Sequence, residues 1–126
     1  MRISRVWIAY NTRVELSKRF PFAIKQHGED KTPLKLGVKH DLYQRCSDLR
    51  HSAIILALRD YCSGPRYLKN VLLGADRIDL DGNINGTVSE KHAEYAKKQL
   101  AKTRWQKQVA NSQQIRQPEK VARRSL

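Results

Sequence analysis

Two apolar stripes at helical spacing follow each other in the middle of this sequence. Residues three or four positions apart fall on one side of an α-helix, so each stripe predicts a helix with one apolar side. Two such helices can pack their apolar sides together and form the core of a small helical domain. The stripes consist of Val38, Leu42, Cys46 and Leu49, and of Ile54, Leu58 and Tyr61 with Ile55 and Cys62 beside them.

Capping residues predict where helices begin. Asn11 and Thr12 are suited to cap a short helix that Pro21 ends. Ser52 is suited to cap the helix that carries the second stripe. On this interpretation residues 1–11 are an N-terminal extension, and the domain begins at residue 12.

A β-hairpin is predicted after these helices. Ile78 and Leu80 alternate with polar residues, which is typical of a strand with one buried face. Asp81-Gly82 is a strong turn signal, and residues 84–88 can return as the partner strand. The chain is therefore predicted to be mostly α with a small β-hairpin, an α+β domain.

Strand alternation places Arg77 on the polar face of the first strand. Asp79 lies two residues further along the same face, where its carboxylate is expected to hold the Arg77 guanidinium. A plain surface ion pair, worth about 0–1 kcal/mol, is the alternative interpretation.

A helix start is predicted at Pro65, because Ser63 and Gly64 precede it. The first N–H groups of a helix lack partners within the helix and carry partial positive charge, which suits an anion. Arg66 lies in this first turn, where an anionic ligand would offset its unfavourable position. An ordinary capped helix with a solvated arginine explains the same residues.

The C-terminal part of the sequence carries most of the excess positive charge. The formal net charge is +13, and residues 91–126 hold 10 Lys/Arg against 2 Asp/Glu. Such a charge attracts polyanions, nucleic acid first and anionic membrane second. Ser89 is expected to cap a final helix with an inward side of Ala93, Ala96 and Leu100 and a basic ridge of Lys91, Lys98 and Lys102. Residues 104–126 lose the apolar periodicity and are predicted to form a disordered basic tail.

Several other classes of protein are disfavoured. No stretch approaches the roughly 18 apolar residues of a membrane helix, and Cys46 and Cys62 lack the spacing of a zinc site. Both cysteines fall on apolar stripes, so buried, reduced thiols are expected. A calcium loop is excluded because Ile84 stands where such a loop needs glycine. We expect no enzymatic activity, no metal and no cofactor.

An ordered set of segments resembles the FinO/ProQ family of bacterial RNA chaperones. The segments span about residues 12–101, most of the chain, and the ordered set is more specific than any one member. They are Arg19-Phe20-Pro21, Pro33-Leu34-Lys35-Leu36-Gly37-Val38 with Asp41-Leu42, Ala57-Leu58-Arg59-Asp60-Tyr61, Ser63, Arg66-Tyr67-Leu68, and Gly74-Ala75-Asp76-Arg77-Ile78-Asp79-Leu80-Asp81-Gly82.

The resemblance implies a compact domain over residues 12–103 that binds structured RNA. The expected ligands are small RNAs and mRNA 3′ ends, held as a stem-loop with a single-stranded 3′ tail by a monomeric, cytoplasmic protein. Tyr67 is expected either to contact RNA or to belong to the core, and Arg77→Ala is expected to weaken RNA binding and leave folding intact. Mapped by motif, the RNA-binding residues are Lys35, Arg59, Ser63, Gly64, Arg66, Tyr67, Arg77, Lys97 and Lys98.

Two other functions remain open at this point. A basic helical domain can also bind the major groove of DNA, and a basic tail can bind an acidic protein partner. A DNA-binding module would bind duplex DNA as well as hairpin RNA. A protein-interaction adaptor would bind RNA weakly and form a stoichiometric protein complex.

Overall fold

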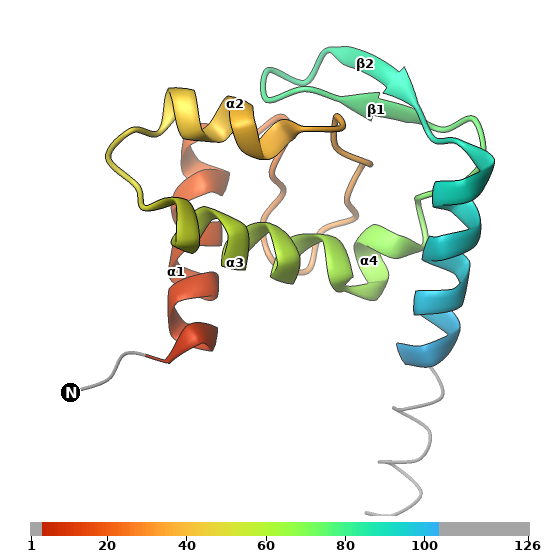
Figure 1. The fold of residues 1–126 in the computed structure, drawn as a ribbon, viewed down its shortest axis with the longest axis horizontal. Coiled ribbons are helices and arrows are strands. Elements are labelled where there is room, and N and C mark those ends of the chain that lie inside the picture. The colour runs from red at the N-terminus through yellow and green to blue at the C-terminus, as the bar shows by residue number, and fades with distance from the viewer. Residues whose placement is uncertain (1–3, 104–126) are drawn as a thin grey trace, which may run out of the picture.

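The computed structural model describes residues 4–103, and the predicted tail lies outside them. Four short helices and a two-stranded sheet are followed by a C-terminal helix that begins at residue 90 (Figure 1). In the figure α1 and the C-terminal helix stand at opposite ends of the line formed by α3 and α4. The predicted class, mostly α with a β-hairpin, is confirmed. The elements are α1 (Arg5–Arg19), α2 (Val38–Arg45), α3 (His51–Ser63), α4 (Pro65–Leu68), β1 (Asp76–Ile78) and β2 (Ile84–Thr87).

One hydrophobic core joins the helices and strand β1, whereas all residues of β2 are exposed. The two predicted stripes supply its centre, where Leu42, Cys46, Ile54 and Tyr61 are fully buried. Leu49 and Leu58 pack against this cluster from its edge. The stripes therefore predicted the core correctly.

Several predicted helix ends are wrong, although α1 does end before Pro21 as predicted. Helix α1 begins at Arg5, because the Ser4 hydroxyl accepts a hydrogen bond from the Trp7 N–H at 3.1 Å. Asn11 lies inside this helix and donates its side-chain amide to the Trp7 carbonyl, a bond that a mid-helix Asn can make without interrupting the helix.

The ends of α2 and α3 also differ from the prediction. Helix α2 stops at Arg45. At this end the N–H of Cys46 donates a hydrogen bond to the Leu42 carbonyl. Arg50 precedes α3 and makes no side-chain capping bond, so Ser52 is not the cap. In contrast, Ser89 caps the C-terminal helix as predicted, because its hydroxyl accepts a hydrogen bond from the His92 N–H.

The hairpin turn is held by one aspartate. The Asp79 carboxylate accepts hydrogen bonds from the backbone N–H groups of Asp81 and Asn83, both at 3.0 Å, which is a bonding pattern typical of Asx-turns. Asp79 is thus engaged in the turn and does not hold Arg77. The strands pair antiparallel with an irregular register between Asp76 and Ile78.

Replacing Gly82 with alanine is expected to lower the free energy of unfolding by about 2 kcal/mol. Gly82 has a φ of +84°, and an added Cβ would lie 2.8 Å from the Cβ of Phe22. The left-handed backbone and the clash both oppose a side chain there. Gly86→Ala is the matched control, because Gly86 has a φ of +91° and open space around it. Equal losses for the two variants in urea unfolding would contradict the clash with Phe22.

Candidate nucleic-acid interface

Three of the segments that carry the family resemblance meet at Leu34. The Leu34 N–H donates to the Tyr67 hydroxyl at 3.0 Å, and the Leu34 carbonyl accepts from Arg77 at 2.7 Å. Leu34 also forms a parallel bridge with Ile78 in strand β1. Both backbone polar groups of Leu34 are therefore held by side chains from other parts of the chain. This junction fixes the segment before α2 against α4 and the hairpin.

Arg77 lies inside the protein, which contradicts the prediction of an exposed polar face. Its exposed fraction is 6%, and its two terminal nitrogens reach the Leu34 carbonyl and, at 3.3 Å, the Nδ1 of His92. Its Nε is buried and has no hydrogen-bond partner among residues 4–103. The prediction from strand alternation is wrong here because the face of β1 that carries Arg77 is covered by the Leu34 segment and the C-terminal helix.

Tyr67 also belongs to the core, which was one of its two predicted roles. Its exposed fraction is 7%, and its ring lies edge-on to Tyr61 with centroids 5.8 Å apart. Burial raises the pKa of the Tyr67 hydroxyl, which therefore stays protonated at neutral pH. With its hydroxyl bound to Leu34 and its ring buried, Tyr67 has no surface for stacking on a base.

A groove of about 280 Å³ lies between α3, α4 and the C-terminal helix. We call it the C-terminal groove. Arg59 and Ser63 line it from α3, and both are exposed. The opposite side includes Tyr95, whose side chain is 63% exposed. The full lining is Arg59, Cys62, Ser63, Leu68, Tyr95 and Gln99.

The two lysines predicted on the C-terminal helix fall on different sides of it. Both are exposed. Lys98 is three residues from Tyr95 and thus its neighbour on the helix surface, whereas Lys97 lies about 200° around the helix from Tyr95. Lys91 and Lys102 share the side of Lys98, so the predicted basic ridge borders the C-terminal groove. Lys97 is not part of this border.

Lys35 is separated from this groove. Its ammonium lies 2.8 Å from the Asp41 carboxylate, and the pair is part of a second hollow that also contains Asp79 and Asp81. These carboxylates offset its charge. An anion therefore meets a weaker field at Lys35 than at Arg59 and the ridge.

Arg66 and Gly64 lie beside the groove. Helix α4 begins at Pro65 as predicted, with Gly64 as its cap residue. The Arg66 side chain is half exposed and points toward Asp30, 3.9 Å away, which Lys69 approaches to 2.9 Å. Lys69 holds the pKa of the Asp30 carboxyl below its ordinary value, so one carboxylate faces two cations. Positive charge remains in excess at this end of α4.

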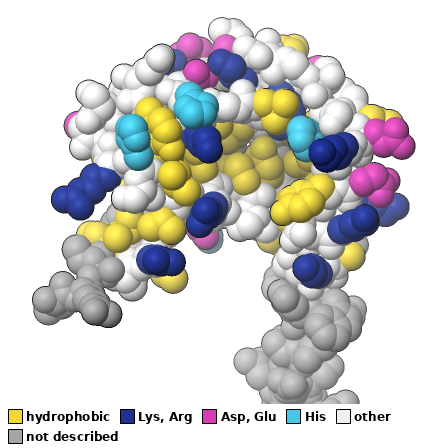
Figure 2. Space-filling model, in the orientation of Figure 1, with side chains coloured by type: hydrophobic (Ala, Val, Ile, Leu, Met, Phe, Trp, Pro, Cys, Tyr) yellow, Lys and Arg dark blue, Asp and Glu magenta, His cyan; other side chains and the backbone are white. Residues whose placement is uncertain are grey.

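Figure 2 shows how these charges are distributed on one face of the molecule. Lys and Arg side chains surround a hollow with hydrophobic side chains on its floor, and acidic side chains lie mostly toward the edge of the view. A concave, basic surface with apolar and aromatic groups is the kind of surface that binds nucleic acid.

Sequence reasoning missed Tyr95 and Gln99. Tyr95 carried a usable signal, because it is an aromatic residue outside the inward stripe of Ala93, Ala96 and Leu100. Its position places it among the lysines of the ridge, and no partner in the core requires it there. Gln99 gave no signal, because polar residues are common on any exposed helix.

Three further structural findings concern other kinds of function. Among residues 4–103, no three His, Cys, Asp or Glu side chains gather in a way that would hold a metal ion. Within the same residues, no helix is long and apolar enough to cross a membrane. Burial raises the pKa of the Cys62 thiol to about 11, so this thiol is protonated at neutral pH and a poor nucleophile.

Comparison with known proteins agrees with the resemblance. The fold is similar to the solution structure of a ProQ homolog from Legionella pneumophila, at 24% identity and a TM-score of 0.63, over 81% of this chain and 84% of that one. It is also similar to a FinO-like RNA chaperone from Neisseria meningitidis MC58, at 23% identity and a TM-score of 0.61, over 86% of each chain. The sequence model of the ProQ/FINO family matches residues 11–114. Since this match covers most of the sequence, the protein belongs to the ProQ/FINO family.

Proposed function

We propose that this protein is an RNA chaperone that binds structured RNA in the C-terminal groove. The observation that carries the proposal is the groove itself, which Arg59 and the exposed ring of Tyr95 line together. Helical spacing places the exposed ridge of Lys91, Lys98 and Lys102 on the same side of the C-terminal helix as Tyr95. Cations beside an exposed aromatic ring match the two parts of a nucleotide, the phosphate and the base. Membership of the ProQ/FINO family and a FinO-like RNA chaperone of the same fold support RNA as the ligand.

The proposed ligand is a stem-loop with a single-stranded 3′ tail. A-form RNA hides the base edges of its major groove, so a protein recognises it by shape, phosphates and unpaired ends. Arg59 and Lys98 contact phosphates of the lower stem, and Tyr95 stacks on an unpaired base of the tail. The segment Ser63–Arg66, which the resemblance assigned to the RNA end, adjoins this groove and receives the 3′ terminus. Gly64 allows the RNA to approach the backbone closely, because it has no side chain.

The proposed consequence is protection and pairing of small RNAs and mRNA 3′ ends. Covering a 3′ end shields it from exonucleases, and neutralising phosphates lowers the repulsion between complementary strands. Binding is the whole of the proposed activity, without covalent chemistry or a cofactor. The protein acts as a monomer in the cytoplasm, where these RNAs occur.

Arg59→Ala and Lys98→Ala are each expected to weaken hairpin binding about 3- to 10-fold. Each removes one phosphate contact. The slope of the logarithm of the binding constant against the logarithm of the salt concentration should therefore also fall in magnitude by about one. Tyr95→Ala should cost roughly 5-fold or more because a stacking partner is lost. The measurement is fluorescence anisotropy with a tailed RNA hairpin across a salt series.

Lys97→Ala is the matched control for Lys98→Ala. It removes the same charge from the neighbouring position of the same helix, on the side away from Tyr95. Its hairpin affinity should stay within about 2-fold of the unmodified protein, since only the general field changes. Equal losses for Lys97→Ala and Lys98→Ala would contradict the assignment of the groove.

A further inference from the structure

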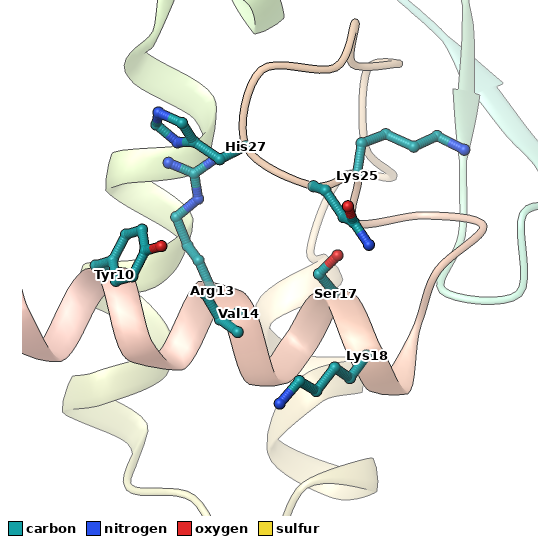
Figure 3. Close-up of a pocket in the computed structure, with 8 residues that line it drawn as sticks. Tyr10, Arg13, Val14, Ser17, Lys18, Lys25 and His27 are labelled. Carbon is teal, nitrogen blue, oxygen red and sulfur yellow. The ribbon is translucent and has the colours of Figure 1, made fainter.

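A second basic hollow, of about 260 Å³, lies between α1 and residues 25–27. We call it the α1 groove. Its residues come from elements that contribute nothing to the C-terminal groove, and α1 and the C-terminal helix stand at opposite ends of the structure (Figure 1). The lining consists of Tyr10, Arg13, Val14, Ser17, Lys18, Lys25, Gln26 and His27 (Figure 3).

The α1 groove has a one-sided charge. Arg13, Lys18 and Lys25 line it together with His27, and none of the lining residues is acidic. Arg13 is largely buried and fixed by the Asp60 carboxylate at 2.7 Å and by the ring of Tyr61 beneath it. In Figure 3 the Arg13 side chain rises from α1 toward His27, while Lys18 and Lys25 extend outward at the other end. Asp60 offsets much of the charge of Arg13, so the positive charge that an anion meets here comes mainly from Lys18 and Lys25.

The same groove exposes aromatic surface. Tyr10 is 53% exposed, and its ring meets the His27 ring edge-on with centroids 6.4 Å apart. Trp7 precedes Tyr10 by one helical turn and is 56% exposed. Trp7, Tyr10 and Val14 thus form an uncovered apolar strip along α1, at positions where the core needs no side chain. Leaving large aromatic rings in water forgoes the stabilisation of burial, so a ligand that covers them gains free energy.

We propose that the α1 groove is a second RNA site, which binds unpaired nucleotides. Bases stack on Tyr10 and Trp7, and their phosphates contact Lys18 and Lys25. Aromatic platforms beside a positively charged groove are the general means by which proteins hold single-stranded nucleic acid. A free phosphate would use the cations and leave the rings uncovered, and an acidic peptide would leave the stacking surface unused. The proposal rests on the proposed function, because it adds a single-stranded segment to the RNA bound in the C-terminal groove.

Two separate grooves would hold two RNA segments at once. One protein would bind the stem and 3′ end of one RNA in the C-terminal groove and an unpaired segment in the α1 groove. When that segment belongs to a second RNA, the protein brings two strands together, which raises their effective concentration for pairing. Binding in the α1 groove should therefore contribute to strand annealing more than to hairpin affinity.

The test is whether a single-stranded oligonucleotide binds to a protein that is already occupied. The full chain is saturated with an unlabelled tailed hairpin, and a fluorescent uridine 12-mer is titrated at near-physiological salt. The double variant Tyr10→Ala, Lys18→Ala should lower 12-mer affinity about tenfold or more and keep hairpin affinity within about twofold. Tyr95→Ala should instead lower hairpin affinity and keep 12-mer affinity within about twofold. Lys39→Ala, which removes an exposed lysine from α2, should change neither affinity.

The results separate this proposal from the proposed function. Stoichiometric displacement of the 12-mer by the hairpin would overturn it, because one site would then serve both ligands. Equal losses of both affinities in the Tyr10, Lys18 variant would overturn it as well. Retained 12-mer binding with no hairpin binding would uphold the α1 groove and refute the function proposed for the C-terminal groove. Crosslinks from 4-thiouridine in the 12-mer should map to α1, and crosslinks confined to the C-terminal helix would contradict the assignment.

Discussion

Arg77→Ala is expected to lower the free energy of unfolding by about 1.5–3 kcal/mol. The side chain is buried and donates to the Leu34 carbonyl at 2.7 Å, and a lost hydrogen bond from a charged group costs about this much. The buried Leu34 carbonyl would also be left without this donor. Urea unfolding followed by circular dichroism measures the loss. RNA affinity should fall only to the extent that the folded fraction and the shape of the domain change.

Arg59→Ala is the control for Arg77→Ala. It removes the same charge from an exposed position in the C-terminal groove. Its stability should stay within about 0.5 kcal/mol of the unmodified protein, while its hairpin affinity falls. The opposite pattern, an Arg77→Ala protein with unchanged urea midpoint and lost hairpin binding, would mean that Arg77 contacts RNA directly.

Tyr67→Ala is expected to cost more, about 3–5 kcal/mol. Truncating a buried aromatic ring removes its contacts and leaves a cavity, and the Tyr67 ring packs against Tyr61. The Leu34 N–H would also lose its acceptor. A domain of ordinary stability has only about 5–15 kcal/mol in total, so this variant should be partly unfolded at 37 °C. Its thermal and urea transitions measure the effect.

Tyr67→Phe separates the hydroxyl of Tyr67 from its ring. The ring stays, so the loss should be about 1–3 kcal/mol, from the unsatisfied Leu34 N–H alone. Hairpin affinity of the folded variant should remain within about twofold. A Tyr67→Phe protein of full stability that no longer binds the hairpin would show that the hydroxyl serves RNA and not the fold.

Periodicity predicted the core but not the ends of the helices. Leu42, Ile54 and Tyr61 are buried as their spacing required, because a stripe of several residues leaves few alternatives. Capping was ambiguous, since Ser4 and Asn11 both suit a helix start and only packing shows that the helix continues through Asn11. A local signal cannot decide between two acceptable caps.

The positions of the candidate site residues were predicted only in part, because two of them are buried against the backbone of Leu34. Strand alternation assumes that the second face of a strand meets solvent, whereas the face of β1 that carries Arg77 is covered from a distant part of the chain. Tyr67 and Arg77, which both stand in segments that carry the resemblance, hold the fold together at Leu34. Arg59 and Ser63, both predicted to bind RNA, line the same groove. Tyr95 completes that groove from a helix whose orientation is set by tertiary packing.

Binding to three ligands of equal charge tests the central claim most directly. They are an RNA hairpin with a single-stranded U-rich 3′ tail, the same hairpin without its tail and lengthened to match the charge, and a duplex DNA. At near-physiological salt, recognition of shape and of an unpaired end predicts a preference of about tenfold or more for the tailed hairpin. Equal and steeply salt-dependent binding to all three would contradict the account, because the protein would then be a nonspecific polyanion binder.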